Sequence, residues 1–116
     1  MAQVTIVIIP SSYQAMWLFA MFDLPVDTAA ARKRYTRFRK GLLAEGFTML
    51  QFSVYARYCP SEESAEAHRR RIRAMLPDDG QVRLLSITEC QFSKMEVFFG
   101  KKRVETEDPP SQLMLF

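Results

Sequence analysis

The apolar run Met16–Phe22 (MWLFAMF) constrains the fold of this 116-residue chain more than any other segment. Side chains alternate between the two faces of a strand, and here both faces would be hydrophobic. The run therefore predicts a central strand that is covered on both sides. Asp23-Leu24-Pro25 ends the strand. A chain of this length has room for one domain and one core.

Two helices are predicted from apolar periodicity and from their end signals. Asp27 or Thr28 caps the first helix, and Gly46 ends it. Its inner face carries Ala31, Tyr35, Phe38 and Leu42. The second helix opens at Pro60-Ser61 and is closed by Pro77. It has Glu62 and Glu63 in its first turn and Arg69, Arg70, Arg71 and Arg73 toward its end, an arrangement that the helix dipole favours. Its only histidine, His68, is interpreted as a packed core residue.

The remaining segments are rich in β-branched and aromatic residues, so we expect strands. Phe47–Cys59 (FTMLQFSVYARYC) predicts two short strands or one bent strand. Val82–Thr88 and Gln91–Gly100 predict two more, and residues 4–9 before Pro10 could form another. The element order predicts an α+β fold, a ferredoxin-like βαββαβ sandwich with both helices on one face of the sheet.

The extra strand at the C-terminal end has no place in a four-stranded sheet. Pairing it with a second copy of the chain, as a homodimer, is the economical solution. The chain then divides into an N-terminal extension of uncertain structure (1–15), a ferredoxin-like domain (16–100) and a C-terminal tail (101–116).

Composition excludes several function classes. Cys59 and Cys90 have no CxxC or His-Cys spacing near them, which argues against a disulfide framework or a zinc site. The apolar N-terminus is too short for a membrane span and has no signal-cleavage pattern, so we expect a cytoplasmic protein. The chain contains no Gly-rich phosphate loop, nucleophile elbow or HExxH helix. Most enzyme classes therefore lose support.

The first predicted helix carries a concentration of positive charge. Six cations fall within nine residues, and no acidic residue lies between Asp27 and Glu45. These cations are Arg32, Lys33, Arg34, Arg37, Arg39 and Lys40. They flank the apolar stripe of Tyr35 and Phe38 and form a positive rim that could follow a phosphate backbone. The alternative is an ordinary solvated helix surface. The net charge of +3 alone decides nothing.

Asp23 is the candidate for metal binding and catalysis. It lies at the end of a buried strand, at a sheet edge that a ligand can approach. One carboxylate is few for Mg²⁺, but two copies of Asp23 near a dimer axis could share a metal or flank a phosphodiester. The alternative is a turn aspartate that accepts hydrogen bonds from nearby backbone N–H groups.

Four features together resemble a known family, CRISPR-associated protein two, the small subunit of the CRISPR adaptation machinery. They are Phe22–Pro25 (FDLP), the basic helix that ends at Gly46, Leu50–Tyr55 (LQFSVY) and Val82–Gly100 (VRLLSITECQFSKMEVFFG). The FDLPV form and the QFSKMEVFFG ending are most similar to members from type II systems. The resemblance covers residues 16 to about 100.

The resemblance implies a ferredoxin-like homodimer that completes its sheets with C-terminal strands. It also implies a scaffold that lies between two dimers of the integrase subunit and binds the double-stranded DNA of a new spacer. The alternative that it implies is an endonuclease that depends on Mg²⁺ and cuts single-stranded RNA or double-stranded DNA through Asp23. Arg32, Arg34 and Tyr55 match basic and aromatic family positions. Met49 stands where several members carry a basic residue, which weakens the nuclease hypothesis.

Two further possibilities stay open at this point. A single-chain RNA-binding module of the same general fold would need an RNP-like aromatic pattern, which this chain lacks. The tail after Pro109-Pro110 ends in an apolar peptide that carries Gln112, Leu113, Leu115 and Phe116. This peptide resembles the QLxLF motif that docks into the replication sliding clamp; alternatively, it packs as a strand on the partner copy or on the integrase.

Overall fold

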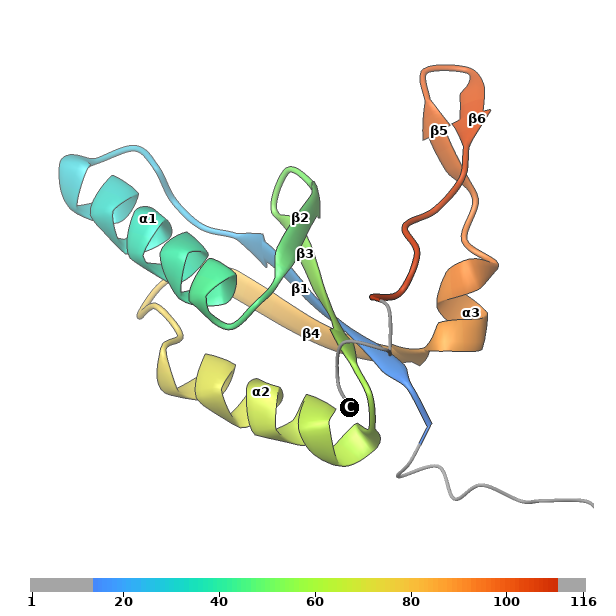
Figure 1. Ribbon diagram of the computed structural model, residues 1–116. Coiled ribbons are helices and arrows are strands. Elements are labelled where there is room, and N and C mark those ends of the chain that lie inside the picture. The colour runs from blue at the N-terminus through green and yellow to red at the C-terminus, as the bar shows by residue number, and fades with distance from the viewer. Residues whose placement is uncertain (1–13, 111–116) are drawn as a thin grey trace, which may run out of the picture.

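The structure is a computed structural model that describes residues 14–110, and its strands and helices are mixed along the chain (Figure 1). They are β1 (Met16–Asp23), α1 (Ala29–Ala44), β2 (Thr48–Gln51), β3 (Val54–Cys59), α2 (Glu62–Ala74), β4 (Gln81–Thr88), α3 (Glu89–Ser93), β5 (Val97–Phe99) and β6 (Lys102–Val104). The predicted strand over residues 4–9 and the terminal peptide 112–116 lie outside the described residues.

Four strands form one antiparallel sheet in the order β2-β3-β1-β4. β1 is central, with Met16 opposite Cys59 of β3 and Thr88 of β4. The prediction of a ferredoxin-like α+β fold with Met16–Phe22 as a central strand is confirmed. Phe47–Cys59 forms two strands, β2 and β3, with an irregular register between Met49 and Gln51.

Both long helices pack on one face of the sheet (Figure 1). Leu18, Ala20 and Phe22 point from β1 into a core that includes Leu42 of α1 and Ile72 of α2. The predicted caps are present: Thr28 Oγ1 accepts from the Ala31 N–H at 3.0 Å, and Ser61 Oγ accepts from the Ser64 N–H at 3.1 Å. Each cap satisfies an N–H group that the first helical turn leaves without a partner.

The other face of the sheet is covered over part of its area by α3. Trp17 and Phe19 of β1 pack there with Ala56 and with Phe92, which is fully buried. Trp17 and Phe92 stack with ring centroids 4.0 Å apart and an interplanar angle of 12°. This helix explains why β1 is apolar on both faces.

The predicted strand over Gln91–Gly100 is wrong in its first half, where the chain forms α3 instead. The physical reason is a capping box: Thr88 Oγ1 accepts from the Gln91 N–H, and the Gln91 side chain accepts from the Thr88 N–H. This reciprocal pair satisfies two N–H groups and starts a helix directly after β4.

The second half of that segment forms a hairpin. β5 pairs with β6 alone, and the turn between them contains Gly100 in the left-handed region, with φ 63°. In Figure 1 the hairpin stands away from the four-stranded sheet. It spans residue 100, where the sequence pattern places the end of the domain. Among residues 14–110, no helix is both long and apolar enough to cross a membrane.

Candidate nucleic-acid interface

One face of α1 presents four of the six predicted cations to solvent. Arg32, Lys33, Arg37 and Lys40 are all exposed. Together with Ala29 and Thr36 they line a shallow surface groove of about 560 Å³. The helical rise of about 1.5 Å per residue spreads these cations over roughly 12 Å. Within residues 14–110, Lys33, Arg37 and Lys40 form no ion pair, so their charge is available to an anionic partner.

The other two cations lie off this row. Arg34 is half-buried and donates from Nε and Nη2 to the Asp79 carboxylate at 3.3 and 3.2 Å. Arg39 is half-buried and lies four residues after Tyr35 on the helix. Arg34 therefore has part of its charge neutralised inside the fold. The more available anion-binding surface is the α1 basic row, which consists of Arg32, Lys33, Arg37 and Lys40.

Tyr55, predicted from the family resemblance to contact nucleic acid, lies in the core instead. Its side chain is 1% exposed, and its ring stacks on Phe22 with centroids 5.6 Å apart. The alternation of β3 points Tyr55 toward the helices, where a phenol ring fills the layer under α1. Its ring therefore has no access to a bound polymer.

Asp23 is exposed at the end of β1, opposite Gln81 of β4. Met21, Phe22, Gln81 and Arg83 complete a small pocket of about 200 Å³ around it. Within the described part of the chain, its carboxylate accepts no hydrogen bond and forms no ion pair. The structure thus presents Asp23 as a free acceptor at the end of the central strand β1 and does not show the turn hydrogen bonds of the alternative interpretation.

The backbone beside Asp23 is held by a close approach of Gly80. A Cβ at position 80 would lie 2.8 Å from the Asp23 carbonyl oxygen and 2.6 Å from Leu24 Cδ2. Gly80 also has φ +86°, a left-handed conformation that favours glycine. The predicted Asp79-Gly80 turn therefore positions the end of β1 as well as reversing the chain.

The donor set at Asp23 fits Mg²⁺ poorly within one subunit. Mg²⁺ prefers oxygen ligands and usually takes one or two carboxylates, waters and substrate phosphates. Among the described residues that line this pocket, Asp23 is the one carboxylate, and Arg83 brings a positive charge. No group of three or more His, Cys, Asp or Glu side chains within residues 14–110 could hold a metal ion.

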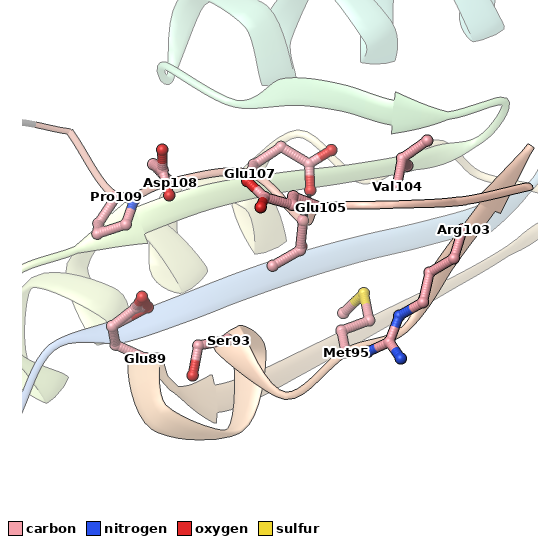
Figure 2. Close-up of a pocket in the computed structure, with 10 residues that line it drawn as sticks. Glu89, Ser93, Met95, Arg103, Val104, Glu105, Glu107, Asp108 and Pro109 are labelled. Atoms are coloured by element: carbon pink, nitrogen blue, oxygen red, sulfur yellow. Dashed lines mark hydrogen bonds between the residues drawn. The ribbon is translucent and has the colours of Figure 1, made fainter.

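A second pocket has the opposite electrostatic character. It occupies about 540 Å³ between α3 and the segment that follows β6, as Figure 2 shows. Its lining includes the carboxylates of Glu89, Glu105, Glu107 and Asp108 and one cation, Arg103. This excess of negative charge would repel a phosphate backbone. The α1 basic row and this pocket therefore carry opposite charge.

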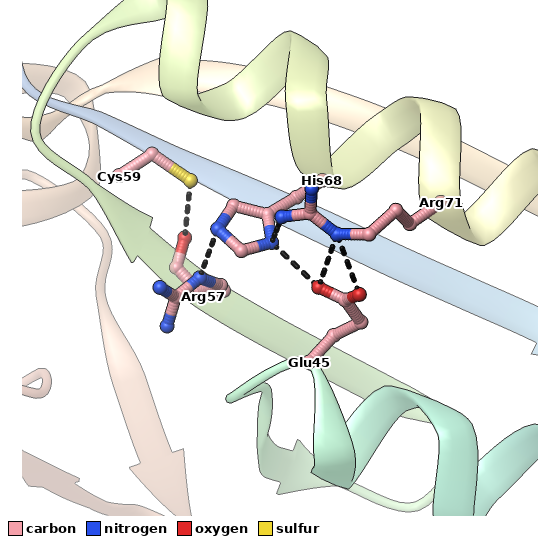
Figure 3. Close-up of polar contacts among 5 residues, drawn as sticks. All are labelled: Glu45, Arg57, Cys59, His68 and Arg71. Atoms are coloured by element: carbon pink, nitrogen blue, oxygen red, sulfur yellow. Dashed lines mark hydrogen bonds and ion pairs between the residues drawn. The ribbon is translucent and has the colours of Figure 1, made fainter.

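His68 lies in a polar cluster that sequence patterns did not reveal (Figure 3). It is buried as predicted, at 8% exposure. Its Nε2 lies 2.8 Å from Arg57 Nε, and its Nδ1 lies 2.8 Å from Glu45 Oε2. Glu45 also accepts from Arg71 Nε at 2.7 Å. The partner carboxylate is 23 residues away in the sequence, so no local spacing could identify it.

Two further arginines of α2, Arg69 and Arg73, are paired with acids of the same helix, as the sequence suggested. Arg69 bonds Glu66 and lies 3.6 Å from Glu62, and Arg73 donates to Glu66 at 2.9 Å. These pairs consume much of the positive charge of α2 and leave α1 as the more basic helix.

Comparison with known proteins gives a consistent result. Residues 16–95 match the family model described as "CRISPR associated protein Cas2". A "CRISPR-associated endoribonuclease Cas2" from Parvibaculum lavamentivorans is 57% identical over 87% of this chain and 100% of its own length. A protein of the same name from Flavobacterium psychrophilum is 49% identical over 91% of this chain and 92% of its own.

A solved structure, described as the crystal structure of cas2, matches the fold with a TM-score of 0.52. The match covers 81% of this chain and 99% of that chain at 21% sequence identity. At this identity the likeness supports the fold alone.

Proposed function

The chain belongs to the CRISPR-associated Cas2 family, and we propose that it acts in CRISPR adaptation as a dimeric scaffold that binds spacer-precursor DNA. Family membership supports a role in adaptation. The observation that carries the DNA-binding part is the α1 basic row, because a positive surface without internal ion pairs can neutralise successive phosphates. In this proposal, the dimer bridges two dimers of the integrase subunit.

Two structural features support a homodimer. The β5–β6 hairpin pairs only with itself, and an isolated two-stranded hairpin has marginal stability in water. Its Phe98 and Phe99 are 52% and 72% exposed. On the sheet, Leu85 is 48% exposed, on the face that α3 covers only in part. A second copy that covers these surfaces would bury both apolar groups and extend the hairpin into a larger sheet.

Charge reversal on α1 tests the proposed DNA surface. Arg37→Glu and Lys40→Glu should weaken binding of a spacer-length DNA duplex and reduce the slope of log K against log salt. Each lost phosphate contact changes this slope by about 0.9. Lys94→Glu alters net charge by the same amount at the C-cap of α3 and serves as the matched control. If all three variants change the slope equally, or if none of them changes it, α1 is not part of the interface.

A nuclease activity is the second candidate, because the relatives are named endoribonucleases and Asp23 is an exposed carboxylate without an internal partner. A metal there would need further oxygen ligands, from the substrate phosphates or from Asp23 of a second copy. Asp23→Asn keeps the shape of the side chain and removes its charge. Loss of Mg²⁺-dependent cleavage of RNA or duplex DNA, with DNA binding unchanged, would support this function. Cleavage that survives Asp23→Asn would exclude Asp23 from it.

The terminal peptide is proposed as a partner-binding segment. Gln112, Leu113, Leu115 and Phe116 lie outside the described residues, so their proposed role rests on sequence alone. Deletion of residues 111–116 distinguishes the two candidate partners. Loss of sliding-clamp capture with integrase binding intact supports the clamp, whereas the reverse result supports packing in the adaptation complex.

A further inference from the structure

The β2–β3 turn presents an aromatic ring at the same end of the sheet as Asp23. Phe52 is 79% exposed, the highest value among the exposed large hydrophobic side chains of residues 14–110. A single exposed apolar side chain is ordinary on a protein surface. Three features distinguish this one: its support, its rigidity and its charged surroundings.

Phe52 is supported by a series of ring contacts that connects it to the core. Phe52 stacks on Tyr35 of α1 with centroids 6.5 Å apart and an interplanar angle of 22°. Tyr35 in turn meets Phe22 edge-on at 5.9 Å, and Phe22 is buried. One face of the Phe52 ring is thus backed by a half-buried tyrosine, while the rest of the ring is open to solvent.

The turn that carries Phe52 is held firmly. Its backbone is anchored to β1, because the Phe22 N–H donates to the Ser53 carbonyl at 3.1 Å. Ser53 has φ 62°, the one left-handed conformation of a non-glycine residue within the described ranges. Such a conformation persists where the surrounding structure holds it. The backbone that carries the ring is therefore preorganised, which reduces the entropy that must be lost when a ligand binds.

The surface of α1 around Tyr35, the residue on which Phe52 stacks, is cationic. Arg32 and Arg39 lie three residues before and four residues after Tyr35, so they flank it on the surface of α1. An aromatic ring between cations matches a nucleic-acid strand, in which a flat base is flanked by phosphates. Bases that are not already stacked in a duplex bind such rings.

We propose that Phe52, backed by Tyr35, is a stacking platform for an unpaired nucleobase, as in a single-stranded overhang of the bound DNA. This inference rests on the proposed DNA-binding function. It adds a requirement for an unpaired base, which the α1 basic row alone does not impose, because phosphate contacts do not read the bases.

The test compares two DNA probes on the full chain: a blunt duplex and the same duplex with a short unpaired overhang that contains 2-aminopurine. Phe52→Leu keeps the apolar bulk but removes the ring, and Phe52→Tyr keeps the ring. Phe52→Leu should weaken binding of the overhang probe by about 5- to 100-fold and leave blunt-duplex binding unchanged. Phe52→Tyr should retain the affinity and the quenching of 2-aminopurine.

Other results distinguish a failure of the stacking platform from a failure of the proposed DNA-binding function. If the blunt duplex binds but Phe52→Leu leaves the overhang affinity unchanged, the stacking platform is overturned while the proposed function stands. If Phe52→Leu changes the sedimentation coefficient of the free protein, Phe52 belongs to a protein interface, which also overturns it. If neither probe binds the wild-type chain, both the platform and the DNA-binding function fail.

Discussion

Arg57 donates a hydrogen bond from Nε to Nε2 of His68 at 2.8 Å, and this contact assigns the tautomer of the neutral histidine. Because Nε2 accepts, the proton of the neutral ring must lie on Nδ1, from which it is donated to Glu45. Arg71 Nη2 lies 3.0 Å from His68 Nδ1, but both atoms are then donors. The hydrogen-bond partner of Arg71 is therefore Glu45. The cluster joins β3, α2 and the C-cap of α1.

The first prediction concerns pH. Burial, with smaller contributions from Arg57 and Arg71, lowers the pKa of His68 below its usual value, although the Glu45 hydrogen bond opposes the shift. The unfolded chain, with a histidine pKa of about 6.5, then binds more protons than the folded chain just below that pH. The free energy of unfolding should therefore be fully retained above about pH 6.5 and decrease as the pH falls toward the lowered value.

Urea unfolding at several pH values between 5 and 7.5 measures this dependence. The His68→Gln variant cannot titrate at this position, so its free energy of unfolding should vary less with pH in that window, even if the variant is less stable throughout.

Glu45 affects the free energy of unfolding at more acidic pH. Burial raises its pKa, but hydrogen bonds from His68 and Arg71 outweigh burial and lower it, so its contribution is lost below about pH 4.5. An unchanged slope in His68→Gln between pH 5 and 6.5 would contradict the lowered pKa of His68.

Gly80→Ala should destabilise the fold by more than about 1 kcal/mol, because it adds both a backbone penalty and a clash with the Asp23–Leu24 backbone. Gly100→Ala is the matched control. Gly100 also has a positive φ, but a Cβ there would meet no atom within 4 Å. Urea unfolding should give the larger loss for Gly80. Equal losses would show that the close approach to β1 contributes nothing.

Phe92→Ala should reduce stability by about 3–5 kcal/mol, the usual range for removing a buried aromatic side chain. Phe92 stacks on Trp17, the only tryptophan of the chain. The fluorescence of Trp17 in the native state should therefore change as well. Phe52→Ala, at a side chain that is 79% exposed, should cost far less. Comparable losses at both positions would contradict a core built by α3.

Leu85→Glu should dissociate the proposed homodimer without unfolding the monomer, because Leu85 is 48% exposed within one chain. A buried charge in a two-fold interface occurs twice, so we expect the dimer dissociation constant to rise by about tenfold or more. Val26→Glu, at a loop residue that is 53% exposed, is the control. Sedimentation velocity measures both, and a dimer that tolerates Leu85→Glu would place its interface elsewhere.

Local patterns predicted the two long helices and the four-stranded sheet because their signals are short-ranged. Thr28 and Ser61 cap helices in the predicted places, and the apolar period of α1 needs no distant partner to be recognised. The strand predicted from Gln91 failed because the β-rich composition was outweighed by the Thr88–Gln91 capping box, a signal that requires only three residues of spacing.

By itself, the sequence determined which segments are buried, that β1 is central, and that positive charge concentrates on α1. These properties follow from hydrophobic periodicity and from the order of charges along one helix. Tertiary structure decided which of those residues are accessible. The alternation of β3 buries Tyr55, Asp79 takes up part of the charge of Arg34, and the β2–β3 turn lifts Phe52 onto Tyr35. Accessibility depends on contacts between segments far apart in the chain, which no local pattern records.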